Sequence, residues 1–313
     1  MKSIKAAVIG AGIMGKNHAR VYSNLDGVNL VAISDIDTEV VKSVGEEYNI
    51  KYYPDYLDMI QTEELDVISI CVPTILHNKV AMDVITKGIH VLIEKPISTT
   101  LSEADEIISA ANENKIKLMV GHIERFNPVV IELKKRIQNN ELGKIYKVHC
   151  ERLSLFPKRI RDVGVMIDLA IHEIDILKYL ISSKVKRVHS EVARRVHSEH
   201  EDLMIGTLRF ENEILGVINV NWLSPRKVRR ITLTGEKGMF IADYLTQELS
   251  FYAKTYVDEN LTEGEKVTIP IIKEEPLKKE IKSFIECINE NTGPIVSGID
   301  GKDALKIAQK FLE

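Results

Sequence analysis

The sequence predicts a protein of two domains: an α/β domain with a parallel, doubly wound sheet, then an α+β domain with a large, mostly antiparallel sheet. Length is the first reason, because 313 residues exceed what a single hydrophobic core usually supports. Secondly, short apolar runs alternate with segments of helical spacing over the first third of the chain, which indicates parallel strands joined by helical crossovers. Thirdly, later strands follow one another without helices between them, and such strands pair antiparallel.

The expected strands of the first domain are apolar and rich in β-branched residues, as strands buried on both faces of a parallel sheet are. They are Ile4–Ile9, Leu30–Ser34, Val67–Val72, His90–Ile93 and Leu118–Val120. The segments between them carry apolar residues at helical spacing. These expected helices are Gly15–Ser23, Glu39–Tyr48, Tyr56–Thr62, Asn78–Lys87 and Ser102–Asn114.

The pattern changes after about residue 122. The expected helices there are Val129–Asn139 and Val165–Leu180, and the expected strands are Lys144–Leu153, Val185–Val196, Leu203–Phe210, Ile214–Trp222, Val228–Thr234, Met239–Asp243 and Glu248–Tyr252. Helices Leu277–Asn289 and Gly301–Leu312 close the chain, the second with Ser297 or Asp300 as its N-cap. We therefore expect domains at 1–121 and 122–296, with a C-terminal helix within 297–313 packed back on the first domain.

Composition excludes several classes of protein. A formal net charge of −4 gives no electrostatic basis for nucleic acid as the main ligand. The three cysteines are far apart and form no CxxC motif, so we expect thiols in a reducing compartment. The first apolar run is too short for a signal peptide, and no segment approaches the ~20 apolar residues of a membrane span. We expect a cytoplasmic protein that binds neither nucleic acid nor membranes.

A glycine motif follows the first strand and opens the first helix. It reads Gly10-Ala11-Gly12-Ile13-Met14-Gly15, the GxGxxG pattern of a dinucleotide-binding Rossmann domain. Gly10 permits the tight turn, Gly12 lets a pyrophosphate approach the backbone, and Gly15 lets helix and strand pack closely. The phosphates would then lie at the positive end of the helix dipole, beside Ile13 and Met14. A plain glycine turn between a strand and a helix is the alternative.

An acidic residue ends the second strand, where a ribose diol is held in such domains. Asp35 lies there, in the segment Ser34-Asp35-Ile36-Asp37. The loop contains no arginine or lysine that could neutralise a 2′-phosphate, so the sequence favours NAD over NADP. A helix cap is the alternative role for a carboxylate at this position.

Several motifs together resemble the glucose-fructose oxidoreductase, inositol dehydrogenase and MocA family over nearly the whole chain. The matching residues are Gly10–Gly15 with His18, Pro73-Thr74 with His77, Glu94-Lys95-Pro96, and Asp168 with His172. Glu-Lys-Pro at the end of a strand together with Asp-x-x-x-His downstream is a specific combination. The resemblance implies an NAD-dependent dehydrogenase whose further cofactor contacts are Pro73, Thr74, His77, Glu94, Lys95 and Arg125.

The chemistry of alcohol oxidation gives three of these residues catalytic roles. His172 is the candidate base because histidine titrates near neutral pH. Asp168 lies one helical turn earlier and could orient the imidazole, while Asp175 on the same side could contact ribose or substrate. By the resemblance, Lys95 contacts both the substrate hydroxyl and the nicotinamide ribose. A surface salt bridge on the helix and a surface turn at Lys95 are the alternatives, and the geometry of the Lys95–Pro96 bond stays open.

Two stretches resemble the UDP-N-acetylglucosamine 3-dehydrogenases within this family. They are Gly121–Pro128 and Leu155–Gly164. Their basic residues Arg125, Lys158, Arg159 and Arg161 suit an anionic substrate such as a nucleotide sugar better than a neutral polyol. Asn127 and Arg159 are accordingly expected to bind substrate together with Lys95, Asp168, His172 and Asp175. A solvated basic loop is the alternative.

The resemblance, together with the basic residues, implies oxidation of UDP-N-acetylglucosamine at carbon 3. A dehydrogenase of a free polyol, sugar or sugar acid and a non-catalytic NAD-binding regulator are the alternatives. No cluster of metal ligands is evident.

We interpret Trp222 as core or subunit packing, and the basic run Arg226, Lys227, Arg229 and Arg230 as an exposed strand face. Apolar strand residues suggest a homodimer or homotetramer, and they include Ile205, Leu208, Ile218 and Val220.

Overall fold

The computed structural model describes residues 3–157, 163–196, 199–257, 260–262 and 264–312. The chain forms two units, of which the first comprises Met1–Ile123 and Leu277–Leu305 and the second Glu124–Pro276 and Lys306–Glu313. The domain boundary that the sequence predicts, at residue 121, lies close to the observed division between Ile123 and Glu124. The segment Leu277–Leu305 belongs to the first unit, whereas the sequence analysis assigned residues up to 296 to the second domain.

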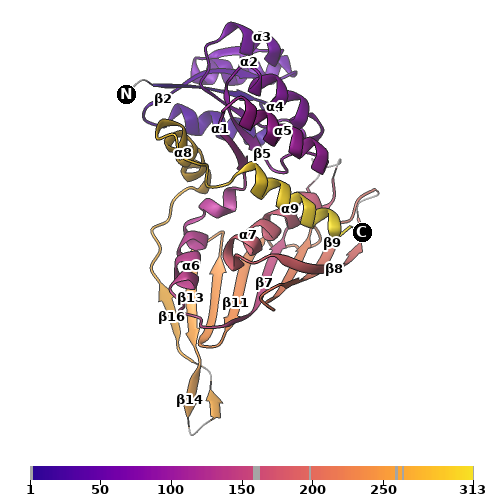
Figure 1. Ribbon diagram of the computed structural model, residues 1–313, viewed down its shortest axis with the longest axis vertical. Helices are drawn as coiled ribbons and strands as arrows, with labels where there is room; N and C mark the ends of the chain where they lie inside the picture. The colour runs from indigo at the N-terminus through magenta and orange to yellow at the C-terminus, as the bar shows by residue number, and fades with distance from the viewer. Residues whose placement is uncertain (1–2, 158–162, 197–198, 258–259, 263, 313) are drawn as a thin grey trace. The chain divides into compact units, whose positions relative to one another are not determined.

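A six-stranded parallel sheet forms the centre of the first unit (Figure 1). Its strand order is β3-β2-β1-β4-β5-β6, the order of a dinucleotide-binding Rossmann sheet. The strands are β1 Ile4–Ile9, β2 Val28–Ser34, β3 Lys51–Tyr53, β4 Val67–Ile70, β5 His90–Glu94 and β6 Leu118–Gly121. The α-helices of this part are α1 Ile13–Ser23, α2 Thr38–Tyr48, α3 Tyr56–Thr62, α4 His77–Ile85, α5 Leu101–Glu113 and α8 Pro276–Asn289.

Local sequence explains where these helices begin. The Asp37 side chain accepts a hydrogen bond from the backbone N–H of Val40 at the start of α2. Thr100 and Glu103 form a reciprocal capping box at the start of α5. The edge strand β3 was not predicted, because its sequence Lys-Tyr-Tyr lacks the apolar run that marks the central strands.

The last helix, α9 Gly298–Lys310, follows a segment that extends the first sheet. The backbone N–H of Val120 in β6 donates to the carbonyl of Val296, and Met119 pairs with Ser297 as an antiparallel bridge. Both expected capping residues take part: the Ser297 N–H donates to Asp300 Oδ2 at 2.9 Å, and the Asp300 N–H donates to Ser297 Oγ at 3.3 Å. The chain from Leu277 to Leu305 therefore completes the first unit.

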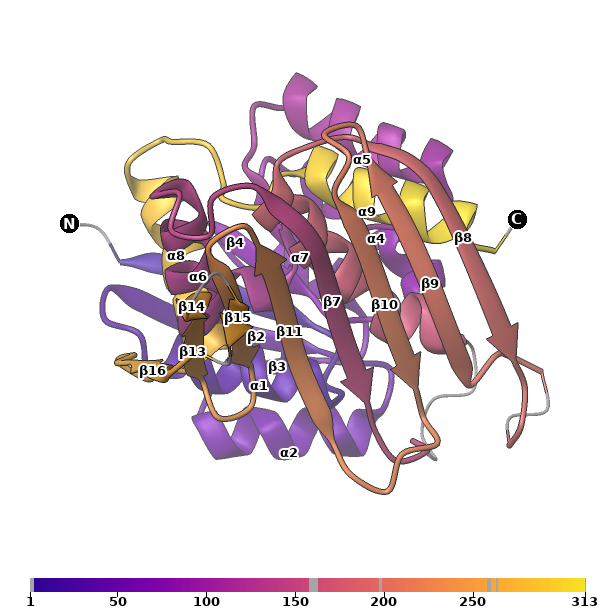
Figure 2. The same ribbon diagram turned by 90° about the horizontal axis from the view of Figure 1, so that it is seen from below.

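The second unit contains an eight-stranded sheet with the order β16-β13-β12-β11-β7-β10-β9-β8 (Figure 2). β7 and β10 pair in parallel, and the other neighbours pair antiparallel. The large sheet is therefore mostly antiparallel, as predicted. The strands are β7 Ile145–Leu153, β8 Val185–Ala193, β9 Leu203–Phe210, β10 Leu215–Asn221, β11 Val228–Gly235, β12 Gly238–Asp243, β13 Glu248–Ala253 and β16 Lys266–Ile269. A small two-stranded sheet consists of β14 Thr255–Val257 and β15 Asn260–Thr262.

Helices cover one face of the large sheet. α6 Pro128–Gln138 packs on β12 and β13, while α7 Ile171–Ile181 packs on β7 and β10. Figure 2 shows the opposite face of β11, β7, β10, β9 and β8 with no helix of the described residues over it. The face packed by helices is the core of the unit, and it contains Phe210, Phe240 and the fully buried Trp222.

Alternation along β9 and β10 decides which apolar residues face outward. Leu208, Ile218 and Val220 are buried in the core, so these three do not support the predicted self-association, which stays a prediction. Ile205 on β9 does face outward and is 49% exposed. The reason is the two-residue period of a strand, which places Leu208 and Ile205 on opposite faces.

The predicted helix at 165–180 consists of two segments of different geometry. Residues Met166–Ala170 form a π-helical turn, and α7 continues from Ile171 to Ile181. π-Turns of this kind occur often at functional sites, because they change the direction of side chains along an otherwise regular helix. Asp168 lies in the π-turn and His172 in the first turn of α7.

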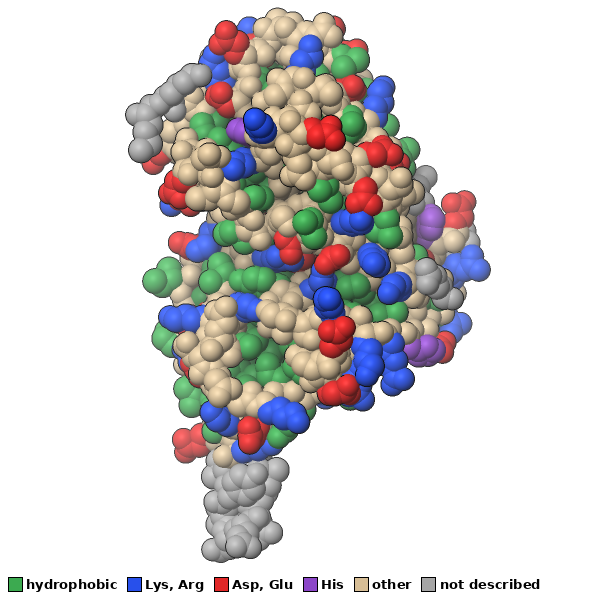
Figure 3. Space-filling model, viewed as in Figure 1, with side chains coloured by type: hydrophobic (Ala, Val, Ile, Leu, Met, Phe, Trp, Pro, Cys, Tyr) green, Lys and Arg blue, Asp and Glu red, His purple; other side chains and the backbone are tan. Residues whose placement is uncertain are grey.

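Surface charge is mixed. Figure 3 shows acidic and basic side chains next to one another on the visible face. Among the described residues, no helix combines the length and apolar character that crossing a bilayer requires.

We expect Gly15→Ala to destabilise the protein strongly. A Cβ at position 15 would lie 1.7 Å from the carbonyl oxygen of Gly10, and a backbone oxygen cannot move aside. A loss of about 3 kcal/mol or more is expected, at or beyond the upper end of ordinary overpacking. Gly12→Ala is the matched control, because a Cβ there meets no atom within 4 Å. Urea unfolding that gave equal stabilities for the two variants would contradict this packing.

Candidate functional site

The reversal in strand order between β1 and β4 marks the ligand-binding edge of the first sheet. Open α/β sheets bind ligands outside the carboxyl ends of their strands at this point. Gly10 follows β1 with φ at +97°, and a Cβ there would lie 2.5 Å from the carbonyl oxygen of Cys71, the residue after β4. The loop therefore passes close to β4 because glycine is present.

Gly12 lies at the entrance to α1 and faces open space. It is the N-cap residue of that helix and has no side chain to bond the first backbone N–H groups. An uncapped helix N-terminus with its partial positive charge suits a phosphate group. The two glycines of the turn thus make a site that fits the pyrophosphate of a dinucleotide.

Asp35 follows β2 beside the glycine loop. Its Oδ2 accepts a hydrogen bond from the backbone N–H of Ala11 at 2.5 Å, and its Oδ1 accepts one from Asp37 at 2.9 Å. The residue that caps α2 is Asp37, so Asp35 is not the helix cap. Its contact with the glycine loop places a carboxylate where a ribose diol would bind.

Exposed apolar side chains follow three strand ends of the same sheet. Ile13 after β1 is 60% exposed, Ile36 after β2 is 91% exposed and Ile75 after β4 is 71% exposed. Ile36 and Ile75 were not predicted as site residues, although large apolar residues are unusual in strand-end loops and could have marked them. Apolar walls beside a few polar groups are typical of cofactor sites.

His77 links the loops that follow β4 and β5. Its Nδ1 lies 2.8 Å from the carbonyl oxygen of Pro96, and its Nε2 lies 3.0 Å from that of Val72. Burial lowers the pKa of His77, although both carbonyls favour its protonated form. The Lys95–Pro96 peptide bond is cis. His77 therefore holds the segment that carries Lys95, in addition to the cofactor contact expected for it with Pro73 and Thr74 in the same loop.

Glu94 is held by a buried chain of hydrogen bonds. Its Oε1 lies 3.0 Å from His18 Nε2, while His18 Nδ1 lies 2.9 Å from Ser69 Oγ. Tyr22 Oη lies 2.8 Å from the same Ser69 oxygen. Burial would raise the pKa of Glu94, but the hydrogen bond and charge of His18 hold that pKa below its usual value. The backbone N–H of Lys95 also donates to Glu94, so the chain orients the start of the Glu-Lys-Pro motif.

One trio of the described residues has ligand atoms close enough to share a metal ion. The ligand atoms of His18, Cys71 and Glu94 lie within 4.8 Å of one another. Both ring nitrogens of His18 already bond Ser69 and Glu94, and burial raises the pKa of the Cys71 thiol well above its usual value. These contacts favour a hydrogen-bonded structural cluster.

Asp168 and His172 belong to the second unit, whereas Lys95 belongs to the first. Asp168 and His172 are partly exposed, and they lie on the helical segment that packs on β7 and β10. The side chains between and after them, including Leu169 and Glu173, are buried. The joint action of Lys95, Asp168 and His172 stays a prediction.

Arg125 and Asp175 bind each other. The Arg125 Nε donates to Asp175 Oδ2 at 2.8 Å and its Nη2 to Oδ1 at 2.6 Å, a buried bidentate pair. The guanidinium also lies over the ring of Tyr179. These contacts favour a structural role for both residues, so their expected contacts with cofactor and substrate stay predictions.

Asn127 is also occupied within the second unit. Its Oδ1 accepts from the backbone N–H of Val129 as the N-cap of α6, and its Nδ2 donates to Tyr244 O at 3.1 Å and to Glu124 Oε2 at 3.2 Å. The expected substrate contact of Asn127 therefore stays a prediction. Arg159 lies outside the described residues, as do Lys158 and Arg161.

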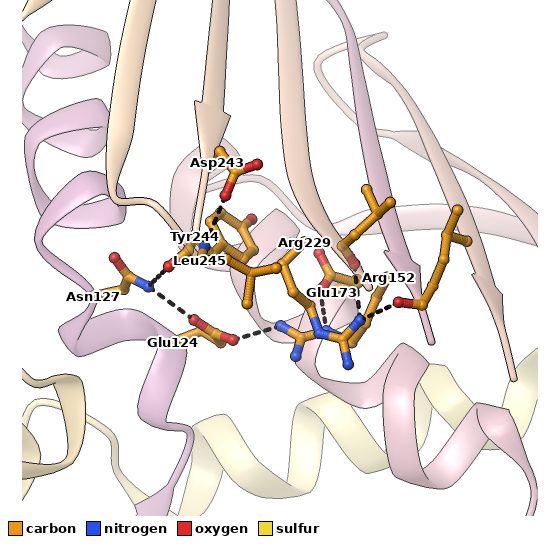
Figure 4. Close-up of polar contacts among 10 residues, drawn as sticks. Glu124, Asn127, Arg152, Glu173, Arg229, Asp243, Tyr244 and Leu245 are labelled. Atoms are coloured by element: carbon orange, nitrogen blue, oxygen red, sulfur yellow. Dashed lines mark hydrogen bonds and ion pairs between the residues drawn. The ribbon is translucent and has the colours of Figure 1, made fainter. Parts of the chain in front are cut away.

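A buried charge network joins three elements of the second unit (Figure 4). Arg152 on β7 donates to Glu124 at 2.7 Å through Nη2 and to Glu173 at 2.5 Å through Nε. Burial would lower the pKa of Arg152, but the two carboxylates raise it. Burial raises the pKa of Glu173 despite the charge of Arg152. Sequence reasoning missed this network, although alternation along β7 places Arg152 on the same face as the buried Cys150.

A pocket of about 280 Å³ lies beside this network. Its lining includes Asp168, Lys227, Arg229 and the apolar Leu155, Leu169 and Trp222. Arg229 is only 7% exposed, so the interpretation of the whole basic run as an exposed strand face is wrong for this residue. Arg230 does face outward and pairs with Glu151. Trp222 packs in the core as expected, edge-on to Phe156.

Comparison with known proteins identifies the class of this fold and site. Residues 4–122 match the oxidoreductase family with an NAD-binding Rossmann fold, and residues 130–241 match the GFO/IDH/MocA C-terminal domain. An uncharacterised oxidoreductase of Bacillus subtilis (strain 168) is 30% identical, over 98% of this chain and 93% of its own. The chain therefore belongs to the GFO/IDH/MocA family of oxidoreductases.

Two further proteins are similar to this chain over nearly its whole length. The myo-inositol 2-dehydrogenase of Thermotoga maritima is 27% identical over 99% of this chain and 96% of its own. The solved structure of the UDP-N-acetylglucosamine 3-dehydrogenase of Acidithiobacillus ferrooxidans is 25% identical, covers 99% of this chain and 97% of its own, and superposes with a TM-score of 0.90.

The cofactor is NAD. The family match gives this assignment, and the observed features fit it: an uncapped helix N-terminus at Gly12, a carboxylate at Asp35 and exposed apolar residues at the strand ends. Of the residues expected to contact NAD, Gly10, Gly12, Ile13, Met14, Gly15 and Asp35 lie in or beside one loop. Their individual contacts stay predictions.

We expect the double variant Asp35→Ser, Ile36→Arg to reverse the preference between NAD and NADP. The change removes a carboxylate that repels a 2′-phosphate and adds a guanidinium that can bind it. The ratio of kcat/KM for the two cofactors should move toward NADP by about two orders of magnitude.

Asp37→Ser is the matched control in the same loop. Asp37 caps α2, so its replacement can affect stability but leaves the expected ribose carboxylate in place. An equal shift of cofactor preference in both variants would contradict the role assigned to Asp35.

Proposed function

We propose that this oxidoreductase oxidises UDP-N-acetylglucosamine at carbon 3 to the 3-keto sugar. The observation that carries the proposal is the likeness to the UDP-N-acetylglucosamine 3-dehydrogenase of Acidithiobacillus ferrooxidans, which extends over both units at a TM-score of 0.90. The basic pocket beside Asp168 supports an anionic substrate.

His172 is the base of the proposed reaction. It takes the proton of the substrate hydroxyl, a role that suits an imidazole near neutral pH. Asp168, four residues earlier, orients the imidazole and stabilises its protonated form. When bound, NAD supplies the acceptor for the hydride that leaves the substrate carbon.

Lys95 stabilises the negative charge that develops on the substrate oxygen. Its position is supported by contacts on both sides: Glu94 accepts from its backbone N–H, and His77 bonds the carbonyl of Pro96. These contacts restrain the backbone that carries the Lys95 side chain, which limits the reorganisation needed in the transition state.

Turnover by the purified protein tests the substrate directly. With NAD and UDP-N-acetylglucosamine, we expect NADH to form, as measured by absorbance. No NADH with this sugar, but turnover of free myo-inositol or a free sugar, would replace the proposal with the polyol dehydrogenase that the Thermotoga maritima relative suggests.

We expect His172→Ala to lower kcat by about 100-fold or more while leaving the Kd for NAD unchanged, because general-base catalysis contributes on this scale. His189→Ala is the matched control, since His189 lies on β8 with its side chain 76% exposed. Unchanged turnover in His172→Ala would contradict the assigned base. It would also favour a different catalytic residue over the proposed one.

We further propose that the uncovered face of the large sheet joins copies of this chain into a dimer or tetramer. Ile205 on β9 and Leu215 on β10 are exposed there, whereas the other face is packed by helices. An extended sheet face with exposed apolar side chains is a typical site of self-association.

We expect Ile205→Lys to reduce the molecular mass in solution, because a buried ammonium would disrupt a sheet-to-sheet contact. Light scattering after size exclusion measures the mass. Ile299→Lys, an equally polar change at a 63% exposed residue of the first unit, serves as control. A monomeric wild type, or the same oligomer in Ile205→Lys, would contradict this interface.

A further inference from the structure

Arg229 is a buried cation on the wall of a pocket. Its Nη1 donates to the backbone carbonyls of Leu153 at 2.7 Å and Val228 at 2.8 Å. Among the described residues, no carboxylate forms a hydrogen bond or ion pair with this guanidinium. The two carbonyl contacts fix the orientation of the group but supply no negative charge.

The carboxylates of the neighbouring charge network attract Arg229 but form no ion pair with it. Glu124 and Glu173 both bind Arg152, which is also buried. Burial, followed by the repulsion of Arg152, lowers the pKa of Arg229 to about 10. Arg229 therefore stays protonated at neutral pH, and a buried cation of this kind is stabilised by an anion that enters the pocket.

Two further residues define the chemistry of the pocket. Lys227 lines it, is exposed, and forms no ion pair with the described residues. Asp168, the residue expected to orient the base, lines the same pocket and attracts Arg229. The pocket thus carries two cations beside a residue of the proposed reaction.

The size and walls of the pocket fit part of a ligand. Its volume of about 280 Å³ is smaller than the roughly 300–1,000 Å³ typical of pockets that enclose whole ligands. Leu155, Leu169 and Trp222 form apolar walls, which strengthen electrostatic contacts by excluding water.

We propose that Arg229 and Lys227 form a subsite for an anionic group of the substrate, next to Asp168. This assignment rests on the proposed function, under which the anionic group is the diphosphate of the nucleotide sugar. In a sugar acid, a carboxylate would offer the same chemistry. The guanidinium forms directional hydrogen bonds to the anion, and the lysine adds a mobile charge at the pocket entrance.

Substitutions in the basic run test the subsite. We expect Lys227→Gln and Arg229→Gln to raise the KM for UDP-N-acetylglucosamine and the Kd of UDP about tenfold or more, since each removes a charged hydrogen bond. The Kd for NAD should stay unchanged. Arg229→Lys should restore part of the affinity, because it retains the charge but lacks the planar fork.

Arg226→Gln is the matched control. Arg226 belongs to the same exposed loop and the change removes the same charge, but the residue does not line the pocket. Its KM and Kd should stay within about twofold of the wild type, since an exposed charge outside the site contributes little. Should Arg229→Gln fail to fold, Lys227→Gln and Arg229→Lys still test the proposal.

The outcomes separate the subsite from the proposed function. If the wild type oxidises UDP-N-acetylglucosamine and the pocket variants keep its KM, the subsite is wrong while the function stands. If the wild type does not oxidise this sugar, the function is wrong, and the variants are compared on glucuronate and neutral myo-inositol. If the pocket variants lose activity on glucuronate but keep it on myo-inositol, the result supports a subsite for a carboxylate. If the variants lose no more activity on glucuronate than on myo-inositol, the subsite is wrong.

Discussion

Arg152 lies buried between the carboxylates of Glu124 and Glu173, and these ion pairs join a strand to two helical segments of the second unit. Such a network adds little net stability compared with an apolar core of the same shape, because desolvation of the charges offsets their attraction. Its geometric effect is larger. Leaving any one of the three charges without its partners would be costly, so β7, the turn at Glu124 and helix α7 are held in one arrangement.

The site depends on that arrangement in two ways. Glu173 directly follows His172, so its bond to Arg152 restrains the helix turn that carries the candidate base. Both carboxylates form their ion pairs with Arg152, so they attract Arg229 only at longer range and do not offset the effect of burial and of Arg152 on its pKa. The same network therefore orients the proposed catalytic helix and leaves a positive charge on the wall of the pocket.

In the first unit, the segment around Lys95 is held by a buried set of polar contacts. His77 bonds the loops after β4 and β5, and the chain from Tyr22 through Ser69 and His18 ends on Glu94. Both sets of contacts converge on the short segment that contains Lys95. Polar groups in a buried region need partners, and here the partners also orient the motif that the family resemblance marks as functional.

The sequence by itself determined the order of the elements, the nucleotide-binding loop and the family, because periodicity, the spacing of the glycines and short motifs are local properties. It placed β1, α3 and β9 at their observed bounds. It could not show that Arg125 binds Asp175, which is 50 positions away, or that Arg229 faces a pocket with Asp168. Alternation along β11 places Arg229 on the buried face with Ile231, yet only packing decides whether a buried cation meets a carboxylate or a cavity. The tertiary structure decided these pairings because they join segments distant in the chain, and no local pattern records which charges meet.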